Sequence, residues 1–358
     1  MHIVTIVGAR PQFIKASAFS RALKDLEIPE VIIHTGQHFD DNMADIFFRQ
    51  MEIPEPSYNL GIHSMNHGAM TGRMMEEIEK ILLQEKPNAV VVFGDTNSTL
   101  AGALAASKLH IPIAHVEAGL RSFNMQMPEE VNRILTDRIS SFLFCPTAVA
   151  VQHLEQEGCN HWNSKVFLTG DIMYDVALHY GRIASTQSDI ISRLSLMDKP
   201  FLLVTLHRQE NTVDKSRLRE IVDALYQLAM HYRIIMPLHP RTRNVILDLD
   251  LRLPFDPIDP VGYLDMVELL RNCAFVITDS GGLQKEAYFF GKYCLVTRNE
   301  TEWTELVDLN YNFLVGASRH LILEKARQIK HLSGTFDEMP FGRGDAAIKM
   351  AKILKTNC

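Results

Sequence analysis

Acidic side chains follow apolar segments in the first half of this sequence. Asp95 comes just after "AVVVF", and Glu117 comes just after "IPIAHV". Glu129 stands directly behind Pro128, a residue that is favoured at the first position of a helix. Carboxylates that meet at one site differ in pKa, so that one can remove a proton and another can return it. These residues therefore indicate acid–base chemistry on a substrate.

Asp95 and Glu117 also have structural explanations. Asp95 could cap the helix that is expected to begin near residue 97, although the three polar residues after it compete for that place. Glu117 could form a salt bridge with Arg121 or His115. The sequence alone leaves both explanations open.

Glu129 and Glu130 stand together in the first turn of the helix expected over 128–139. Acids at that place stabilise a helix through its dipole. Successive helical residues diverge by about 100°, so one of the two can face the substrate while the other faces solvent or Arg133. The pair therefore offers at most one further catalytic acid.

Cationic and imidazole side chains follow other apolar segments. Arg10, in "GARPQFIK", can offer two parallel donors to a phosphate beside a helix N-terminus, or it can be an exposed residue in a plain turn. His207 and Arg208, in "VTLHRQENT", suit acid–base work and anion contact. His239, in "MPLHPRTR", has the matching place one strand later. A buried structural histidine is the alternative for each imidazole.

The segment "TDSGGLQKEA" carries the strongest pattern for phosphate binding. Gly281 and Gly282 let backbone N–H groups approach a phosphate, and Ser280 adds a hydroxyl donor. Glu286 lies two turns into the expected helix, where it can accept two ribose hydroxyls. An ordinary glycine turn between a strand and a helix is the alternative.

These motifs recur because apolar strands alternate with amphipathic helices, the βαβ pattern of a parallel sheet covered on both faces. Ligands of such sheets bind at the carboxyl ends of the strands. The expected fold class is α/β, with two doubly wound Rossmann-like domains. We expect an N-terminal domain over 1–172, a C-terminal domain over 173–342 and, over 343–358, a helix that packs back on the first domain. Helices are expected over 40–50, 97–109, 128–139 and 147–157, and a less regular polar region up to about residue 200.

Composition excludes several classes of partner. The 358 residues are 46% apolar and 22% charged, with a formal net charge of −7, which argues against nucleic acid or an anionic membrane held by bulk charge. The five cysteines are dispersed without metal-ligand spacing, which favours reduced thiols and no metal. Neither a signal peptide nor a long apolar segment is evident, so a cytoplasmic protein without membrane insertion is expected.

Seven motifs together resemble the non-hydrolysing UDP-N-acetylglucosamine 2-epimerases: "GARPQFIK", "GDTNSTLAG", "HVEAGLRS", "MPEEVNR", "HR.EN", "TDSGG.QKEA" and "FGRGDAA". The resemblance implies a glycosyltransferase-B-like fold with a UDP-sugar between the domains, a homodimer, and a role in polysaccharide biosynthesis. It also implies inversion at C2 by anti elimination of UDP, through a 2-acetamidoglucal, and re-addition, with no cofactor and no metal.

The resemblance also implies roles for individual residues. The family's catalytic groups fall on Asp95, Glu117, Glu129 and His207. Its substrate-binding positions fall on Arg10, Lys15, Ser280, Gly281, Gly282 and Glu286. A regulatory pocket, in which substrate acts as activator, would use Gln37, Arg73, Arg208 and His239, with Asp40 in place of a second glutamine.

One departure bears on the substrate. Many members read T-E-R-P-E where this chain reads "TEWTE", so that Trp303 replaces an arginine and Arg298 is another cation available for the nucleotide. The expected substrate is UDP-N-acetylglucosamine, converted to UDP-N-acetylmannosamine. The alternative within the family is UDP-2,3-diacetamido-2,3-dideoxyglucuronate. A glycosyltransferase of the same fold would not need the clustered acids, and a non-catalytic sugar-nucleotide-binding protein would be free to lose them.

Overall fold

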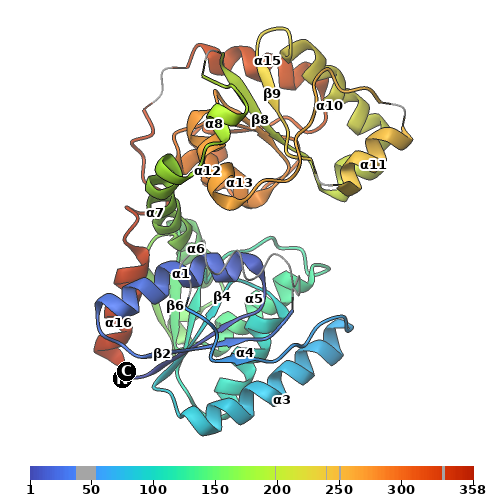
Figure 1. The fold of residues 1–358 in the computed structure, drawn as a ribbon. Coiled ribbons are helices and arrows are strands. Elements are labelled where there is room, and N and C mark those ends of the chain that lie inside the picture. Colours follow the sequence, from blue (N-terminus) through green and yellow to red (C-terminus); the bar gives the residue numbers. More distant parts are fainter. Residues whose placement is uncertain (38–53, 198, 239, 250, 333–334) are drawn as a thin grey trace. The chain divides into compact units, whose positions relative to one another are not determined.

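The computed structural model describes residues 1–37, 54–197, 199–238, 240–249, 251–332 and 335–358 (Figure 1). The chain divides into two compact units: residues 1–176 with 339–358, and residues 177–338. The first boundary lies inside helix α7 (Ile172–Gln187), close to the expected 172/173, and the second lies four residues before the expected 342/343.

The first unit is built on a parallel sheet in the order β3-β2-β1-β4-β5-β6-β7. Its central strands β1 and β4 are completely buried and apolar except at Thr5, as expected for a sheet that is covered on both faces. The strands are β1 (Ile3–Val7), β2 (Glu30–His34), β3 (Tyr58–Asn59), β4 (Ala89–Phe93), β5 (Ile113–Val116), β6 (Phe142–Cys145) and β7 (Lys165–Leu168).

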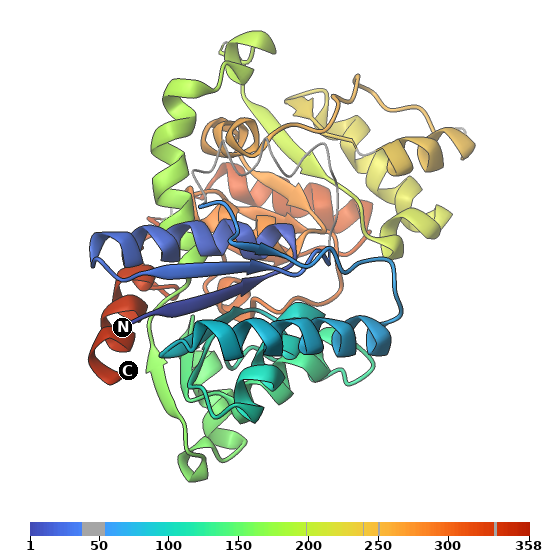
Figure 2. The ribbon, with the colours of Figure 1, turned by 60° about the horizontal axis from the view of Figure 1, so that its bottom comes forward.

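Helices cover both faces of this sheet, with α1 on one face and α3 and α4 on the other (Figure 2). The C-terminal helix α16 packs beside α1, and Asp175 of α7 accepts hydrogen bonds from its first two N–H groups at 3.1 and 2.9 Å. The helices of this unit are α1 (Arg10–Asp25), α3 (His67–Glu85), α4 (Asn97–Lys108), α5 (Pro128–Ile139), α6 (Ala148–Gln156), the short η1 (Cys159–His161), the start of α7, and α16 (Ala346–Asn357).

The second unit is built on a parallel sheet in the order β12-β11-β10-β8-β9. Its strands are β8 (Phe201–Thr205), β9 (Arg233–Ile235), β10 (Val276–Thr278), β11 (Cys294–Val296) and β12 (Asn312–Leu314). Its helices are the remainder of α7, α8 (Ile190–Arg193), α9 (Gln209–Val213), α10 (Lys215–Leu228), α11 (Pro240–Asp248), α12 (Tyr263–Asn272), α13 (Gly281–Phe289), α14 (Thr304–Asp308) and α15 (Arg319–Lys330).

The expected fold class, two doubly wound α/β domains, is confirmed. The expected irregular region up to residue 200 is wrong in part, because α7 continues to Gln187, with apolar residues such as Val176 and Tyr180 buried at helical spacing. Helix α3 was not predicted, and the helix predicted over 40–50 lies outside the described residues. Within the described residues, no helix combines the length and apolar character needed to cross a bilayer.

Candidate active site

The turn after β4 presents Asp95 at the carboxyl end of the sheet. Gly94 adopts a left-handed conformation (φ 62°), and Thr96 caps α4 by accepting a hydrogen bond from the N–H of Thr99 at 3.3 Å. Asp95 is therefore not the cap. Its carboxylate instead forms an ion pair with Arg133 of α5, and its carbonyl accepts a hydrogen bond from Asn132 at 2.9 Å. Helix α5 thus holds both the carboxylate and the backbone of Asp95.

Glu117 lies beside the same turn, at the end of β5. Its side chain is 8% exposed, and its backbone has φ 71°, a left-handed conformation that is costly for a residue with a side chain. It pairs with Lys15 of α1, whereas Arg121 and His115, the partners considered in its structural alternative, pair with Asp137. A Cβ atom placed on Gly94 would lie 3.3 Å from Glu117 Oε2 and 3.7 Å from Lys15 Nζ. The Asp95 turn and the Glu117–Lys15 pair are therefore adjacent.

A buried cluster of ion pairs contacts both of these turns. Asp137 of α5 is completely buried and accepts hydrogen bonds from His115 Nδ1 at 2.6 Å, Arg121 at 2.8 Å and the N–H of Gly119 at 3.1 Å. Arg121 also holds Glu157 with two bonds, at 2.6 and 2.8 Å. Burial alone would raise the pKa of Asp137, but His115 and Arg121 outweigh it and the pKa lies below its ordinary value.

This cluster was missed in the sequence. No hydrophobic pattern marked it, because the buried residues of α5 are polar (Glu130, Asn132, Thr136 and Asp137), whereas Leu135 is 46% exposed.

Glu129 and Glu130 separate as helical geometry requires. Glu130 is buried and accepts hydrogen bonds from the N–H groups of Ser122 and Phe123, at 2.9 and 2.8 Å, and its partner on the helix is Arg133 at 3.1 Å. Glu129 is exposed at the surface. Glu130 therefore fixes the loop before α5, and Glu129 is left accessible to a substrate.

Gln12 joins the first turn of α1 to the Asp95 turn. Its side-chain oxygen accepts from the N–H groups of Gly8 and Ala9, and its side-chain nitrogen donates to the carbonyl of Phe93 at 2.7 Å and to two threonines of the α4 cap. Arg10 is exposed at the first position of α1, where a side chain can reach an anion. The sequence offered no reason to select Gln12, since only the fold brings β1 and β4 together.

In the second unit, Asp279 organises the turn that carries His207. Its buried carboxylate accepts hydrogen bonds from the backbone N–H groups of His207 and Arg208, at 3.1 and 3.0 Å, and from Asn211 at 3.2 Å. It also lies 3.0 Å from His207 Nδ1. The His207 side chain is 53% exposed, so its other ring nitrogen remains accessible. Burial tends to raise the pKa of Asp279, but the hydrogen bond and charge of His207 bring it below its usual value. Asp279 was also missed in the sequence.

The segment after β10 forms the expected helix start. Ser280 is the N-cap of α13, and its hydroxyl oxygen accepts from the N–H of Leu283 at 3.5 Å. A Cβ atom on Gly282 would meet nothing within 4 Å, so the backbone there is open to approach. Glu286 lies further along α13, 3.4 Å from the hydroxyl of Tyr263, and burial raises its pKa to about 7.

Arg298 and Trp303 border this helix start. Arg298 donates to Glu302 at 2.9 Å, and a Cβ atom on Gly281 would lie 2.2 Å from the other Glu302 oxygen. Trp303 is buried, and its indole N–H donates to the carbonyl of Gly281 at 2.9 Å. Lys285 Nζ lies 4.1 Å from the centre of the indole ring. Trp303 therefore packs under the Ser-Gly-Gly turn, as a structural residue would.

The predicted regulatory residues occupy separate surroundings. Gln37 accepts from the N–H and hydroxyl of Ser98, at 3.0 and 2.7 Å. Arg73 lies on the exposed face of α3, 3.6 Å from Glu76, and Arg208 follows β8 in the second unit. His239 and Asp40 lie outside the described residues. The regulatory pocket therefore stays a prediction.

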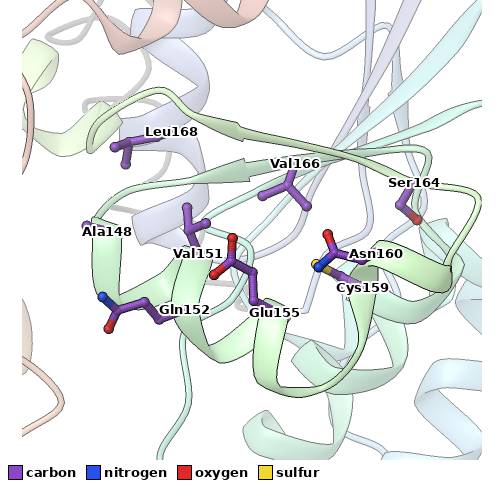
Figure 3. Close-up of a pocket in the computed structure, with 9 residues that line it drawn as sticks. All are labelled: Ala148, Val151, Gln152, Glu155, Cys159, Asn160, Ser164, Val166 and Leu168. Carbon is purple, nitrogen blue, oxygen red and sulfur yellow. The ribbon is translucent and has the colours of Figure 1, made fainter.

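Metal-binding groups and surface hollows are the remaining candidate ligand sites. No group of three metal-binding side chains occurs among the residues that the structure describes. A hollow of about 620 Å³ lies between α6 and β7 (Figure 3), and the predicted catalytic residues are not among the side chains that line it. It is lined by Ala148, Val151, Gln152, Glu155, Cys159, Asn160, Ser164, Val166 and Leu168.

Comparison with known proteins places the whole chain in one family. The family model of the UDP-N-acetylglucosamine 2-epimerases matches residues 21–355. The chain is 53% identical to a Pseudomonas aeruginosa protein named UDP-2,3-diacetamido-2,3-dideoxy-D-glucuronate 2-epimerase, over 99% of each chain. It is 47% identical to a Methanococcus maripaludis protein named as a UDP-N-acetylglucosamine 2-epimerase homolog, also over 99% of each.

The fold is similar along the whole chain as well. A crystal structure of the Methanocaldococcus jannaschii UDP-GlcNAc 2-epimerase, in complex with UDP-GlcNAc and UDP, superimposes with a TM-score of 0.86 at 41% identity and covers 100% of both chains. The expected glycosyltransferase-B-like fold is thereby confirmed.

Proposed function

This chain belongs to the UDP-N-acetylglucosamine 2-epimerase family and is an isomerase of UDP-sugars, and from that premise we propose that it interconverts UDP-N-acetylglucosamine and UDP-N-acetylmannosamine. The observation that carries the proposal is the pair of carboxylates, Asp95 and Glu117, that two neighbouring parallel strands bring to one place. A glycosyltransferase of this fold has no need of such a pair. A protein that only binds sugar nucleotides has no reason to hold Glu117 in a strained backbone conformation.

The carboxylates serve the proton transfers. One of Asp95, Glu117 and Glu129 removes the proton from C2 while the C1–O bond to UDP breaks, which leaves a double bond between C1 and C2. A second acid then delivers a proton to the opposite face of C2 as UDP adds back to C1. Lys15 and Arg133 fix the positions of the two acids that they contact, Glu117 and Asp95.

The second unit would hold the departing UDP. The Ser-Gly-Gly turn offers N–H groups and a helix N-terminus to the diphosphate. His207, oriented by Asp279, can protonate or hydrogen-bond the leaving phosphate oxygen. Glu286 would accept the ribose hydroxyls, with Arg10 and Arg298 as further cations for the phosphates. No cofactor or metal enters this scheme, and the protein is proposed to act as a homodimer.

Incubation with UDP-N-acetylglucosamine in D₂O tests the proposal. C2 must exchange its hydrogen for deuterium, and NMR should show deuterium at C2 in both epimers. Release of a free sugar without deuterium at C2 would instead indicate a hydrolase or a glycosyltransferase.

UDP-2,3-diacetamido-2,3-dideoxyglucuronate is the second candidate substrate, favoured by the 53% identity to the Pseudomonas aeruginosa relative. The two candidates differ at C3 and C6, so a comparison of kcat/KM separates them. We expect the plain N-acetyl sugar to be preferred. A preference above tenfold for the uronate, about 1.4 kcal/mol in transition-state binding, would reverse the assignment.

A further inference from the structure

The environment of His115 defines its charge. The ring is completely buried in β5, and each of its nitrogens contacts an acceptor: Nδ1 lies 2.6 Å from a carboxylate oxygen of Asp137, and Nε2 lies 2.7 Å from the carbonyl oxygen of Gly94. A neutral imidazole has only one N–H and would direct a lone pair at one of these oxygens. Both contacts are satisfied only when both nitrogens carry a proton.

The surrounding groups balance that charge. Asp137 faces His115 and Arg121, and Arg121 faces Asp137 and Glu157. With an imidazolium at His115, two cations and two anions alternate in this cluster and its net charge is zero. An uncharged His115 would leave the cluster with a net charge of −1, with Arg121 as the one cation shared by Asp137 and Glu157.

The Gly94 carbonyl connects this cluster to the turn that carries Asp95. The peptide group that contains it also contains the N–H of Asp95, so the orientation of that plane sets the direction in which Asp95 leaves the strand. The other side of Gly94 is fixed as well, because its N–H donates to the carbonyl of Val116 at 3.0 Å. A left-handed Gly94 has wide conformational freedom of its own, so these two bonds select one orientation.

We propose that His115, held as an imidazolium by Asp137, is a positioning residue that fixes the Gly94–Asp95 peptide and thereby the carboxylate of Asp95. The inference rests on the proposed epimerase reaction, in which Asp95 transfers a proton. His115 does not touch the substrate in this scheme. It acts through a charged hydrogen bond, roughly twice as strong as a neutral one, on the backbone that carries the acid.

Two substitutions separate the two bonds of His115. The side-chain amide of asparagine lies near the place of Nδ1 in histidine. His115→Asn can therefore keep the bond to Asp137, but it loses the bond to Gly94. His115→Gln places its amide near the Nε2 position, so it can keep the bond to Gly94 and loses the bond to Asp137. We expect His115→Asn to lower kcat by about 100-fold with KM changed less than about twofold, because misplacement of a catalytic group by about 1 Å has that effect.

His115→Gln should retain at least about ten times the kcat of His115→Asn, and both variants should bind UDP as the wild type does. The substitution His231→Asn, at an exposed histidine of the second unit, is the control and should change nothing. Equal kcat in the two His115 variants, or a near-normal kcat in His115→Asn, would overturn the positioning role.

An NMR measurement on the wild-type protein tests the charge without any folding risk. With ¹⁵N-labelled histidine, and with the His115→Gln variant used for assignment, both ring nitrogens of His115 should be protonated at pH 7. A single protonated nitrogen would refute the inference. This readout does not depend on turnover, whereas absence of C2 exchange in the wild type would refute the proposed function itself.

Discussion

The two units prepare their functional residues by opposite means. In the first, every proposed catalytic acid except Glu129 is tied to a cation: Glu117 to Lys15 and Asp95 to Arg133, above the Asp137 cluster. In the second, backbone geometry dominates, with an open glycine at a helix start and a turn clamped by Asp279. Groups that exchange protons need a defined charge and a defined position, whereas a diphosphate needs N–H groups that it can approach closely.

This comparison predicts a division of labour. Changes around the first group should reduce turnover and leave UDP affinity unchanged, and changes around the second should weaken UDP binding.

Glu117→Gln should have the largest effect. The substitution keeps the size of the side chain, so the fold and UDP binding should persist, while turnover should fall by roughly 100-fold or more if Glu117 transfers a proton. Deuterium incorporation at C2 measures the chemical step, and calorimetry measures UDP affinity. Glu79→Gln, at an exposed position of α3, is the matched control. Near-normal turnover would remove Glu117 from the mechanism.

Gly119→Ala tests how far the first site depends on its backbone. Gly119 has φ 78°, and a Cβ atom there would lie 2.2 Å from the carbonyl oxygen of Ala150, so we expect a loss of about 2–4 kcal/mol in unfolding free energy. Gly158→Ala has a similar φ of 82° but a nearest neighbour at 4.0 Å, so strain alone should cost about 1 kcal/mol. Gly282→Ala in the second unit should leave stability unchanged and weaken UDP binding. Urea unfolding checks the stabilities, and equal losses for the first two variants would contradict the packing argument.

Sequence could predict the strands and the residues at their ends, because burial on both faces produces continuous apolar runs and ligands bind at one end of a parallel sheet. It could not predict the partners. Lys15 and Glu117 are far apart in the chain, and only the pairing of β1 with β4 and of β4 with β5 brings them together. For the same reason, the sequence suggested Arg121 and His115 for Glu117, whereas both belong to Asp137. Local patterns identify positions, and tertiary contacts decide which charges meet.

Arg10→Ala can contradict this division between the two units, because Arg10 lies in the first unit and its proposed partner is a phosphate. Loss of a charge-assisted contact should weaken the binding of UDP and of UDP-sugar alike, by about 1.5–3 kcal/mol. Calorimetry with both ligands checks this. Arg10→Lys should recover only part of the affinity, because an ammonium lacks the two parallel donors of a guanidinium. Unchanged UDP affinity in Arg10→Ala would exclude Arg10 as a ligand residue.

The smallest expected effect concerns Glu286 and pH. Burial raises the pKa of this half-buried carboxyl from an ordinary 4.5 to about 7, so the protonated form is favoured in the folded protein and its contribution to stability is lost as pH rises from about 4.5 through 7.

The same carboxyl should make UDP binding depend on pH. Only an ionised carboxylate can accept hydrogen bonds from both ribose hydroxyls, so UDP binding must remove the proton of Glu286 and should lower its pKa. UDP affinity should therefore be highest above pH 7 and fall about tenfold between pH 8 and pH 6. Calorimetry across this range measures the change, and the terminal phosphate of UDP titrates in the same range. Glu286→Gln separates the two effects, because its UDP affinity still changes with the titration of the phosphate but no longer with that of the carboxyl. If the wild type and Glu286→Gln show the same pH dependence, Glu286 does not bind the ribose as an anion, and its raised pKa reflects burial beside Tyr263 alone.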